Sequence, residues 1–121
     1  MTDSAALVPP TGRVHWIGTG MSTGSGLGLV CAGADTVLWG RTEEKARRRL
    51  ATLGLDGRAA TRAFTAEALG TELAEGDLVV SMLPPPEHPG LLRLAIGHSA
   101  HFACSSYLSP GIAEQAGAAA A

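Results

Sequence analysis

The sequence predicts an α/β domain built on a doubly wound parallel sheet, with helices covering both faces. Short apolar runs alternate with helix-length segments along most of the chain, and the clearest run, at 77–83, is typical of a strand buried on both faces. Because strand–helix–strand crossovers are right-handed, this alternation predicts three layers, α/β/α. We expect about five strands, all parallel, in the order 3-2-1-4-5.

Each expected element follows from local residue types, taken in chain order. Residues 1–12 contain two prolines and a glycine, so we expect a flexible leader before one domain at 13–121. Apolar and β-branched runs predict strands at 13–18, 35–40, 58–64, 77–83 and 100–106. The intervening segments predict helices at about 22–34, 43–53, 65–76 and 88–96, and a last helix in the Ala-rich tail after Ser109 and Pro110.

Some boundaries have specific signals. Thr42 is a good N-cap residue, and Glu43 and Glu44 favour the positive end of the helix that follows. Gly54 ends that helix, and three consecutive prolines at 84–86 end the fourth strand. The segment at 22–34 is a poor helix former by propensity because of its glycines.

The composition narrows the classes of function. A formal net charge of −2 argues against nucleic acid or an anionic membrane as a partner. The cationic run Lys45–Arg49 follows two glutamates in an expected helix, so we interpret it as a solvated helix face. Cys31 and Cys104 lack metal-ligand spacing, and neither a signal peptide nor a membrane-length apolar segment is present. We expect a cytoplasmic protein.

A glycine-rich turn follows the first expected strand, in the segment "VHWIGTGMSTG". In a parallel α/β fold this turn directs the free N–H groups of the next helix toward a pyrophosphate. Gly18 would allow the tight turn, and Gly20 would let the phosphates approach bare backbone. Thr23 stands at the third glycine position, but Gly24 and Gly28 follow. The turn therefore predicts a Rossmann-type dinucleotide site, with a ligand-free glycine loop as the alternative.

The end of the second strand bears on which dinucleotide is bound. Domains that bind NAD usually have an acidic residue there to hold the ribose 2′-hydroxyl. This chain reads "LWGRT", and its nearest acid, Asp35, comes too early, in the turn that leads into the strand. An arginine with an adjacent hydroxyl suits a 2′-phosphate. Arg41 and Thr42 therefore favour NADP over NAD, with a plainly solvated Arg41 as the alternative.

Four segments resemble the N-terminal cofactor domain of saccharopine dehydrogenases of the saccharopine reductase (L-glutamate-forming) type. They are "GTGMSTG", "WGRTEEKA", "DLVVSMLPPPEH" and "AHFACSSYLSP", and together the resemblance spans about Val14 to Glu114. The last segment is the most specific and the glycine turn the least. Threonine at the third glycine position occurs in that family. Pro85 and Pro86 depart from the aromatic residue and threonine that relatives often have.

The resemblance implies a set of cofactor contacts at the strand ends and at one helix start. From the sequence alone, His88 is only a helix-start residue; the resemblance places it near the cofactor. The implied residues are Gly18, Gly20, Met21, Ser22 and Thr23 for the pyrophosphate, Arg41 and Thr42 for the 2′-phosphate, Leu83 and Pro84 beside the ribose and nicotinamide, and His88, Ser106 and Tyr107 near the nicotinamide or the substrate.

The resemblance also implies an activity for the parent protein, in lysine metabolism. The parent would form or cleave a secondary amine of an amino acid, through hydride transfer between a nicotinamide and an imine. The family's substrate domain follows the point where this chain stops. We expect no catalytic acid–base pair within the segment. His98 and His101 form an H-x-x-H pattern, but they straddle a helix end and a strand start, so we expect no metal site there either. The segment alone should bind cofactor without turnover.

The sequence also allows two alternative functions. The chain could be a stand-alone module that senses NAD(P), or the cofactor domain of a relative that makes carboxynorspermidine or homospermidine. We also expect self-association, because an apolar flank near the fifth strand and the Ala-rich tail would be exposed.

Overall fold

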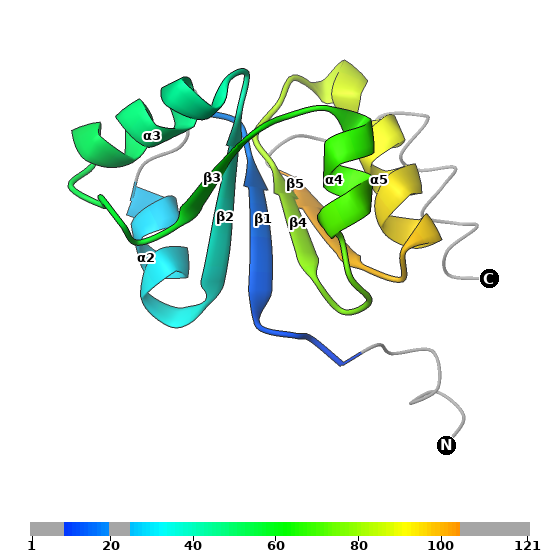
Figure 1. Ribbon diagram of the computed structural model, residues 1–121. Coiled ribbons are helices and arrows are strands. Elements are labelled where there is room, and N and C mark those ends of the chain that lie inside the picture. Colours follow the sequence, from blue (N-terminus) through cyan, green and yellow to red (C-terminus); the bar gives the residue numbers. More distant parts are fainter. Residues whose placement is uncertain (1–8, 20–24, 105–121) are drawn as a thin grey trace.

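The computed structural model describes residues 9–19 and 25–104, and it confirms the predicted sheet (Figure 1). The strand order is β3-β2-β1-β4-β5, and every neighbouring pair is parallel. The strands are β1 (Arg13–Ile17), β2 (Asp35–Gly40), β3 (Ala60–Ala63), β4 (Leu78–Ser81) and β5 (His101–Cys104). The helices are α2 (Ser25–Gly33), α3 (Glu43–Thr52), α4 (Ala66–Glu72), the 3-10 helix η1 (Pro85–Glu87) and α5 (His88–Gly97).

Two of the helices begin with the same local device. The Thr42 hydroxyl accepts a hydrogen bond from the Lys45 N–H at 3.0 Å, which confirms the predicted cap of α3. Thr65 caps α4 in the same way, with its hydroxyl 3.0 Å from the Ala68 nitrogen. The last predicted helix, after Ser109, lies outside the described residues.

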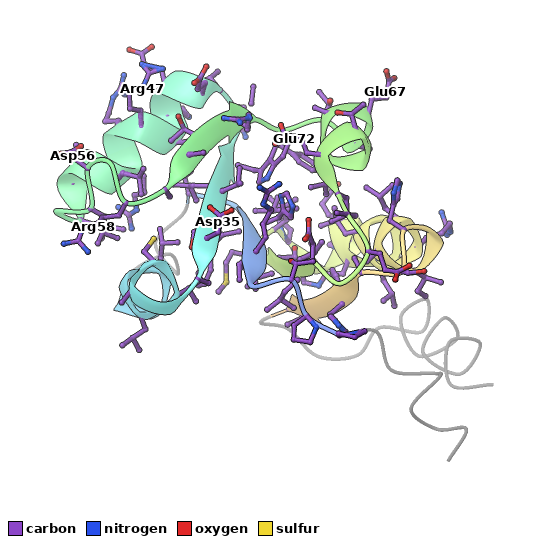
Figure 2. All side chains as sticks on the ribbon, turned by 60° about the horizontal axis from the view of Figure 1, so that its bottom comes forward. Asp35, Arg47, Asp56, Arg58, Glu67 and Glu72 are labelled. Carbon is purple, nitrogen blue, oxygen red and sulfur yellow. The ribbon has the colours of Figure 1, made fainter. Side chains whose placement is uncertain are left out.

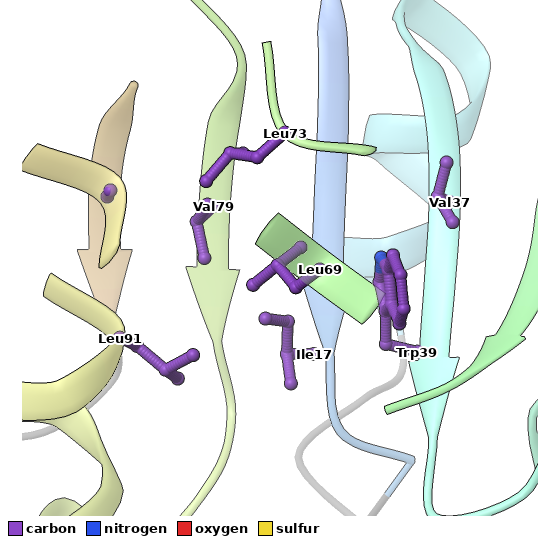
Figure 3. Close-up of a cluster of buried hydrophobic side chains, with 8 residues drawn as sticks. Ile17, Val37, Trp39, Leu69, Leu73, Val79 and Leu91 are labelled. Atoms are coloured by element: carbon purple, nitrogen blue, oxygen red, sulfur yellow. The ribbon is translucent and has the colours of Figure 1, made fainter. Parts of the chain in front are cut away.

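Alternate residues of the central strands enter two separate cores, one on each face of the sheet. Trp16 and Leu38 face α2 and α3, where they pack with Leu27, Ala46 and Leu50. The opposite face packs against α4 and α5, which Figure 1 shows on the other side of the sheet. In Figure 3 the side chains of Leu69 and Leu73 lie over Ile17 and Val79, and Trp39 closes the cluster beside β2. The sheet therefore has helices packed on both faces, as the doubly wound arrangement predicted from the sequence requires.

A buried polar network lies at the end of the sheet where the strands begin. Asp77, directly before β4, accepts hydrogen bonds from the Thr11 hydroxyl at 2.6 Å and from the Ala74 N–H at 3.0 Å. Its other contact is His15 Nε2 at 2.9 Å, while the Trp39 indole N–H donates to His15 Nδ1 at 3.1 Å. Because an indole N–H can only donate, Nδ1 accepts and Nε2 supplies the proton to Asp77.

The network holds a carboxylate in the interior. Burial raises the pKa of Asp77, but the hydrogen bonds from Thr11, the Ala74 N–H and His15 outweigh it and lower that pKa from its usual value. Asp77 also accepts a backbone hydrogen bond from the His101 N–H at 2.7 Å, so it joins the starts of β4 and β5. Of the leader predicted at 1–12, residues 1–8 lie outside the described residues, and Thr11 belongs to this network.

No helix in the described ranges is long and apolar enough to cross a membrane. Within those same ranges, no group of three or more His, Cys, Asp or Glu side chains is arranged to hold a metal ion. Cys31 on α2 and Cys104 on β5 are not joined by a disulfide bond.

Replacing Asp77 with alanine should lower the free energy of unfolding by about 3 kcal/mol, because the buried His15 ring and two partly buried hydrogen bonds, from Thr11 and from the Ala74 N–H, lose their acceptor. The contribution of Asp77 should be complete above the pKa of an unfolded aspartate, about 3.9, and should be lost as the pH falls through its lower folded pKa. Urea denaturation at about pH 7 and about pH 3 measures both effects.

Asp35→Ala is the matched control, because Asp35 also stands at the start of a strand but its side chain is 68% exposed and pairs with Arg13. Its loss should cost less than about 1 kcal/mol. Equal losses for the two variants would show that the buried network does not stabilise the fold.

Candidate cofactor site

The carboxyl ends of three strands converge at one edge of the sheet, the upper edge in Figure 1. The Gly18 N–H donates to the carbonyl oxygen of Trp39 at 2.9 Å, and the Met82 N–H donates to that of Ile17 at 2.8 Å. The chain that leaves β1 therefore lies between the ends of β2 and β4. This is the edge at which doubly wound folds bind their ligands, beside the point where the strand order reverses.

Gly18 is required by the geometry of this turn. Its φ is +122°, a conformation that residues with side chains rarely adopt. A Cβ atom here would also lie 3.1 Å from the Cβ of Met82. The structure thus shows why a glycine follows β1. The other residues predicted for the turn, Gly20, Met21, Ser22 and Thr23, lie outside the described residues.

Gly40, the last residue of β2, is equally confined, and sequence reasoning did not single it out. A Cβ atom on it would lie 3.0 Å from Thr19 Cγ2, 3.0 Å from the Thr42 carbonyl oxygen and 3.1 Å from the Ala46 nitrogen. No side chain fits there without displacing backbone. An acidic residue that would hold a ribose 2′-hydroxyl is therefore excluded at this position by packing.

Arg41 is the first residue after β2 whose side chain can leave the sheet. It is exposed and forms no salt bridge within residues 9–19 and 25–104. Thr42 beside it is exposed, and its hydroxyl accepts the Lys45 N–H while its own hydrogen can still be donated. Asp35 starts β2 at the opposite edge, where it is 3.2 Å from Arg13 (Figure 2). The arginine, and not that acid, lies at the candidate site.

The residues after β4 form a tight turn at the same edge. The Leu83 N–H donates to the buried hydroxyl of Ser81 at 3.2 Å, and the Glu87 N–H donates to the Pro84 carbonyl at 3.0 Å. Leu83 is partly buried against the core under α4 and α5, whereas Pro84 is exposed. The sequence predicted a strand up to Leu83, but β4 ends at Ser81, so both residues lie in the turn after the strand. Their contact with a cofactor stays a prediction.

His88 lies inside the protein at the start of α5. Its side chain is fully buried, and its ring stands edge-on to Phe102 of β5, with ring centroids 6.2 Å apart. A side chain without exposed surface can position its neighbours more readily than it can touch a ligand. Its predicted place near the cofactor is not tested by this geometry. Ser106 and Tyr107 lie outside the described residues.

Comparisons with known proteins agree on one family. The family model described as "Saccharopine dehydrogenase NADP binding domain" matches residues 14–121. Among solved structures, the chain is similar to an apo histidine-tagged saccharopine dehydrogenase (L-Glu forming) from Saccharomyces cerevisiae, with a TM-score of 0.73 and 24% identity. That match covers 84% of this chain and 23% of the yeast chain, so this chain spans about a quarter of that protein's length. Because only 24% of the aligned residues are identical, the similarity to the yeast structure supports the fold alone. No curated protein sequence matches.

NADP is the cofactor of this domain, and the geometry fits it in two respects. The close packing around Gly40 leaves no room for the acid that selects NAD, and Arg41 next to it offers an exposed guanidinium. Gly18, with a φ of +122° and its Cβ position blocked by Met82, forms the kind of tight glycine turn that precedes a phosphate-binding helix N-terminus in this fold.

Gly40→Ala should destabilise the domain by about 1–3 kcal/mol, because its methyl group would press on Thr19 and on the start of α3. The matched control is Gly28→Ala on α2, where a Cβ atom would meet nothing within 4 Å. That change should be neutral or should stabilise the helix by up to about 1 kcal/mol. Chemical denaturation of both variants compares them. Equal stability of the two would contradict the confinement of Gly40.

Proposed function

This chain belongs to the saccharopine dehydrogenase NADP-binding domain family, and we propose that it is the cofactor-binding part of an oxidoreductase that acts on the CH–NH group of a secondary-amine amino acid. The observation that carries the proposal is the site at the carboxyl edge of the sheet, where Gly18, Gly40 and Arg41 meet. We also propose a cytoplasmic location, since two cysteines, Cys31 and Cys104, that are not joined by a disulfide suit a reducing compartment.

The role of this chain in such a reaction is to bind and orient. NADP(H), when bound, supplies or accepts the hydride. The turn after Gly18 would receive the pyrophosphate, Arg41 would pair with the 2′-phosphate, and the turn at Leu83 and Pro84 would border the ribose and nicotinamide. None of these residues needs to transfer a proton. A segment outside this chain would orient the amino-acid substrate.

The self-association expected from the sequence belongs to the same proposal. Ile96, on the outside of α5, is one of two large apolar side chains exposed in the described part of the chain, at 42%. It supports only a small apolar patch on that flank, so any self-association should be weak.

NADPH should bind this domain more tightly than NADH, and Arg41→Ala should narrow the difference by about 1–3 kcal/mol, the scale of a charge-assisted hydrogen bond. Calorimetric titration of both dinucleotides with both proteins measures the effect. Arg58→Ala is the control, because Arg58 is an exposed arginine in the loop before β3 (Figure 2). Equal affinity of the unmutated domain for the two dinucleotides would reject the proposed cofactor site.

A further inference from the structure

A polar pocket of about 250 Å³ lies against α3, next to the candidate cofactor site. Its walls are Thr19, Lys45, Arg48, Arg49 and Thr52. The four helix residues are spaced three and four apart, so they share one face of α3. Thr19 follows Gly18 at the carboxyl edge. One wall of the pocket is therefore part of the turn that follows β1.

The pocket is cationic although the chain as a whole is not. Five of the nine lysine and arginine residues lie between positions 41 and 49, in a chain of net charge −2. Arg47 lies 3.7 Å from Glu43, and Arg48 lies 3.2 Å from Glu44, so these two arginines have acidic partners. Lys45 forms no salt bridge with any described residue. Its ammonium group can therefore pair with an added anion in the pocket.

The cations Lys45, Arg47 and Arg48 of this run are exposed, as predicted, and the side chain of Arg48 is 67% exposed. Figure 2 shows Arg47 on the outer surface of α3, directed away from the sheet, and its side chain is 60% exposed. Lys45, Arg48 and Arg49 also line the pocket, which Arg47 does not. The run therefore has a solvated side and a side that faces a concave surface.

The pocket begins at the end of β2. Thr19 Cγ2 fills the space beside Gly40 from which a side chain would project, and Ala46, next to Lys45, closes it from the helix. In this fold the end of the second strand is where the adenosine ribose is held. A pocket of about 250 Å³ is smaller than a typical site for a whole ligand, about 300–1,000 Å³. It suits one charged part of a dinucleotide.

We infer that Lys45, with Thr19 and Arg48, forms a 2′-phosphate subsite on α3, so that discrimination between NADP and NAD depends on this helix face as well as on Arg41. The inference rests on the proposed function, because it assigns a binding position on α3 to the 2′-phosphate of the NADP that the proposed function requires. The ammonium of Lys45 would supply the charge and the Thr19 hydroxyl a hydrogen-bond donor. Arg48 would add to the charge while it restrains Glu44.

The test measures binding of NADPH and NADH, and of adenosine 2′,5′-bisphosphate and adenosine 5′-monophosphate, to the full chain. Lys45→Met should weaken binding of the two ligands with a 2′-phosphate about tenfold, the scale of one charge-assisted hydrogen bond. The two ligands without it should change less than about twofold. Lys45→Arg, which keeps the charge, should retain most of the affinity.

Arg47→Met is the matched control, because it removes the same charge from the same helix outside the pocket. It should change none of the four affinities by more than about twofold. If the unmutated domain prefers NADPH but Lys45→Met leaves that preference intact, or Arg47→Met reduces it equally, the subsite is wrong and the proposed function stands. If the unmutated domain shows no preference for NADPH, both are wrong.

Discussion

The site depends on close backbone contacts at the carboxyl ends of β1, β2 and β4, where two glycines leave the backbone without side chains. Gly18 and Gly40 leave no space for a Cβ atom, so the strand ends, Thr19 and the start of α3 pack directly against one another. The first side chain free to leave β2 is then that of Arg41. In the proposed site, selection of NADP would depend on packing as well as on charge, because the contact that closes the end of β2 also leaves no room there for an acidic side chain.

The two edges of the sheet handle polar groups in opposite ways. Asp77, where β4 begins, is paired with His15, and His15 in turn accepts the indole N–H of Trp39, so these polar groups satisfy one another in the interior. At the other edge, Arg41 and Lys45 have no acidic partner among the described residues and face solvent. The buried hydrogen bonds among Asp77, His15 and Trp39 hold β1, β2 and β4 in place. The same strands position Gly18 and Gly40 at their carboxyl ends.

Much of the fold was predictable, and less of the site was. Alternation of apolar runs with helix signals, together with right-handed crossovers, was enough to predict the strand order, and Thr42 was identifiable as a cap. The confinement of Gly40 depends on atoms from three separate segments, which spacing along the chain does not reveal. The partners of Asp77 are likewise 62 and 66 residues away, and the choice of which cations of α3 face a pocket depends on how the helix is rotated.

The placement of the two tryptophans gives each face of the sheet its own optical reporter. Trp16 lies in the core beneath α2 and α3, and Trp39 in the core beneath α4 and α5. The carbonyl oxygen of Trp39 also accepts the N–H of Gly18, so one fluorophore is bonded through its backbone to the turn after β1. Tryptophan fluorescence from this protein therefore has two structurally distinct sources. A Trp16→Phe variant would leave Trp39 as the single tryptophan fluorophore, next to the turn after β1.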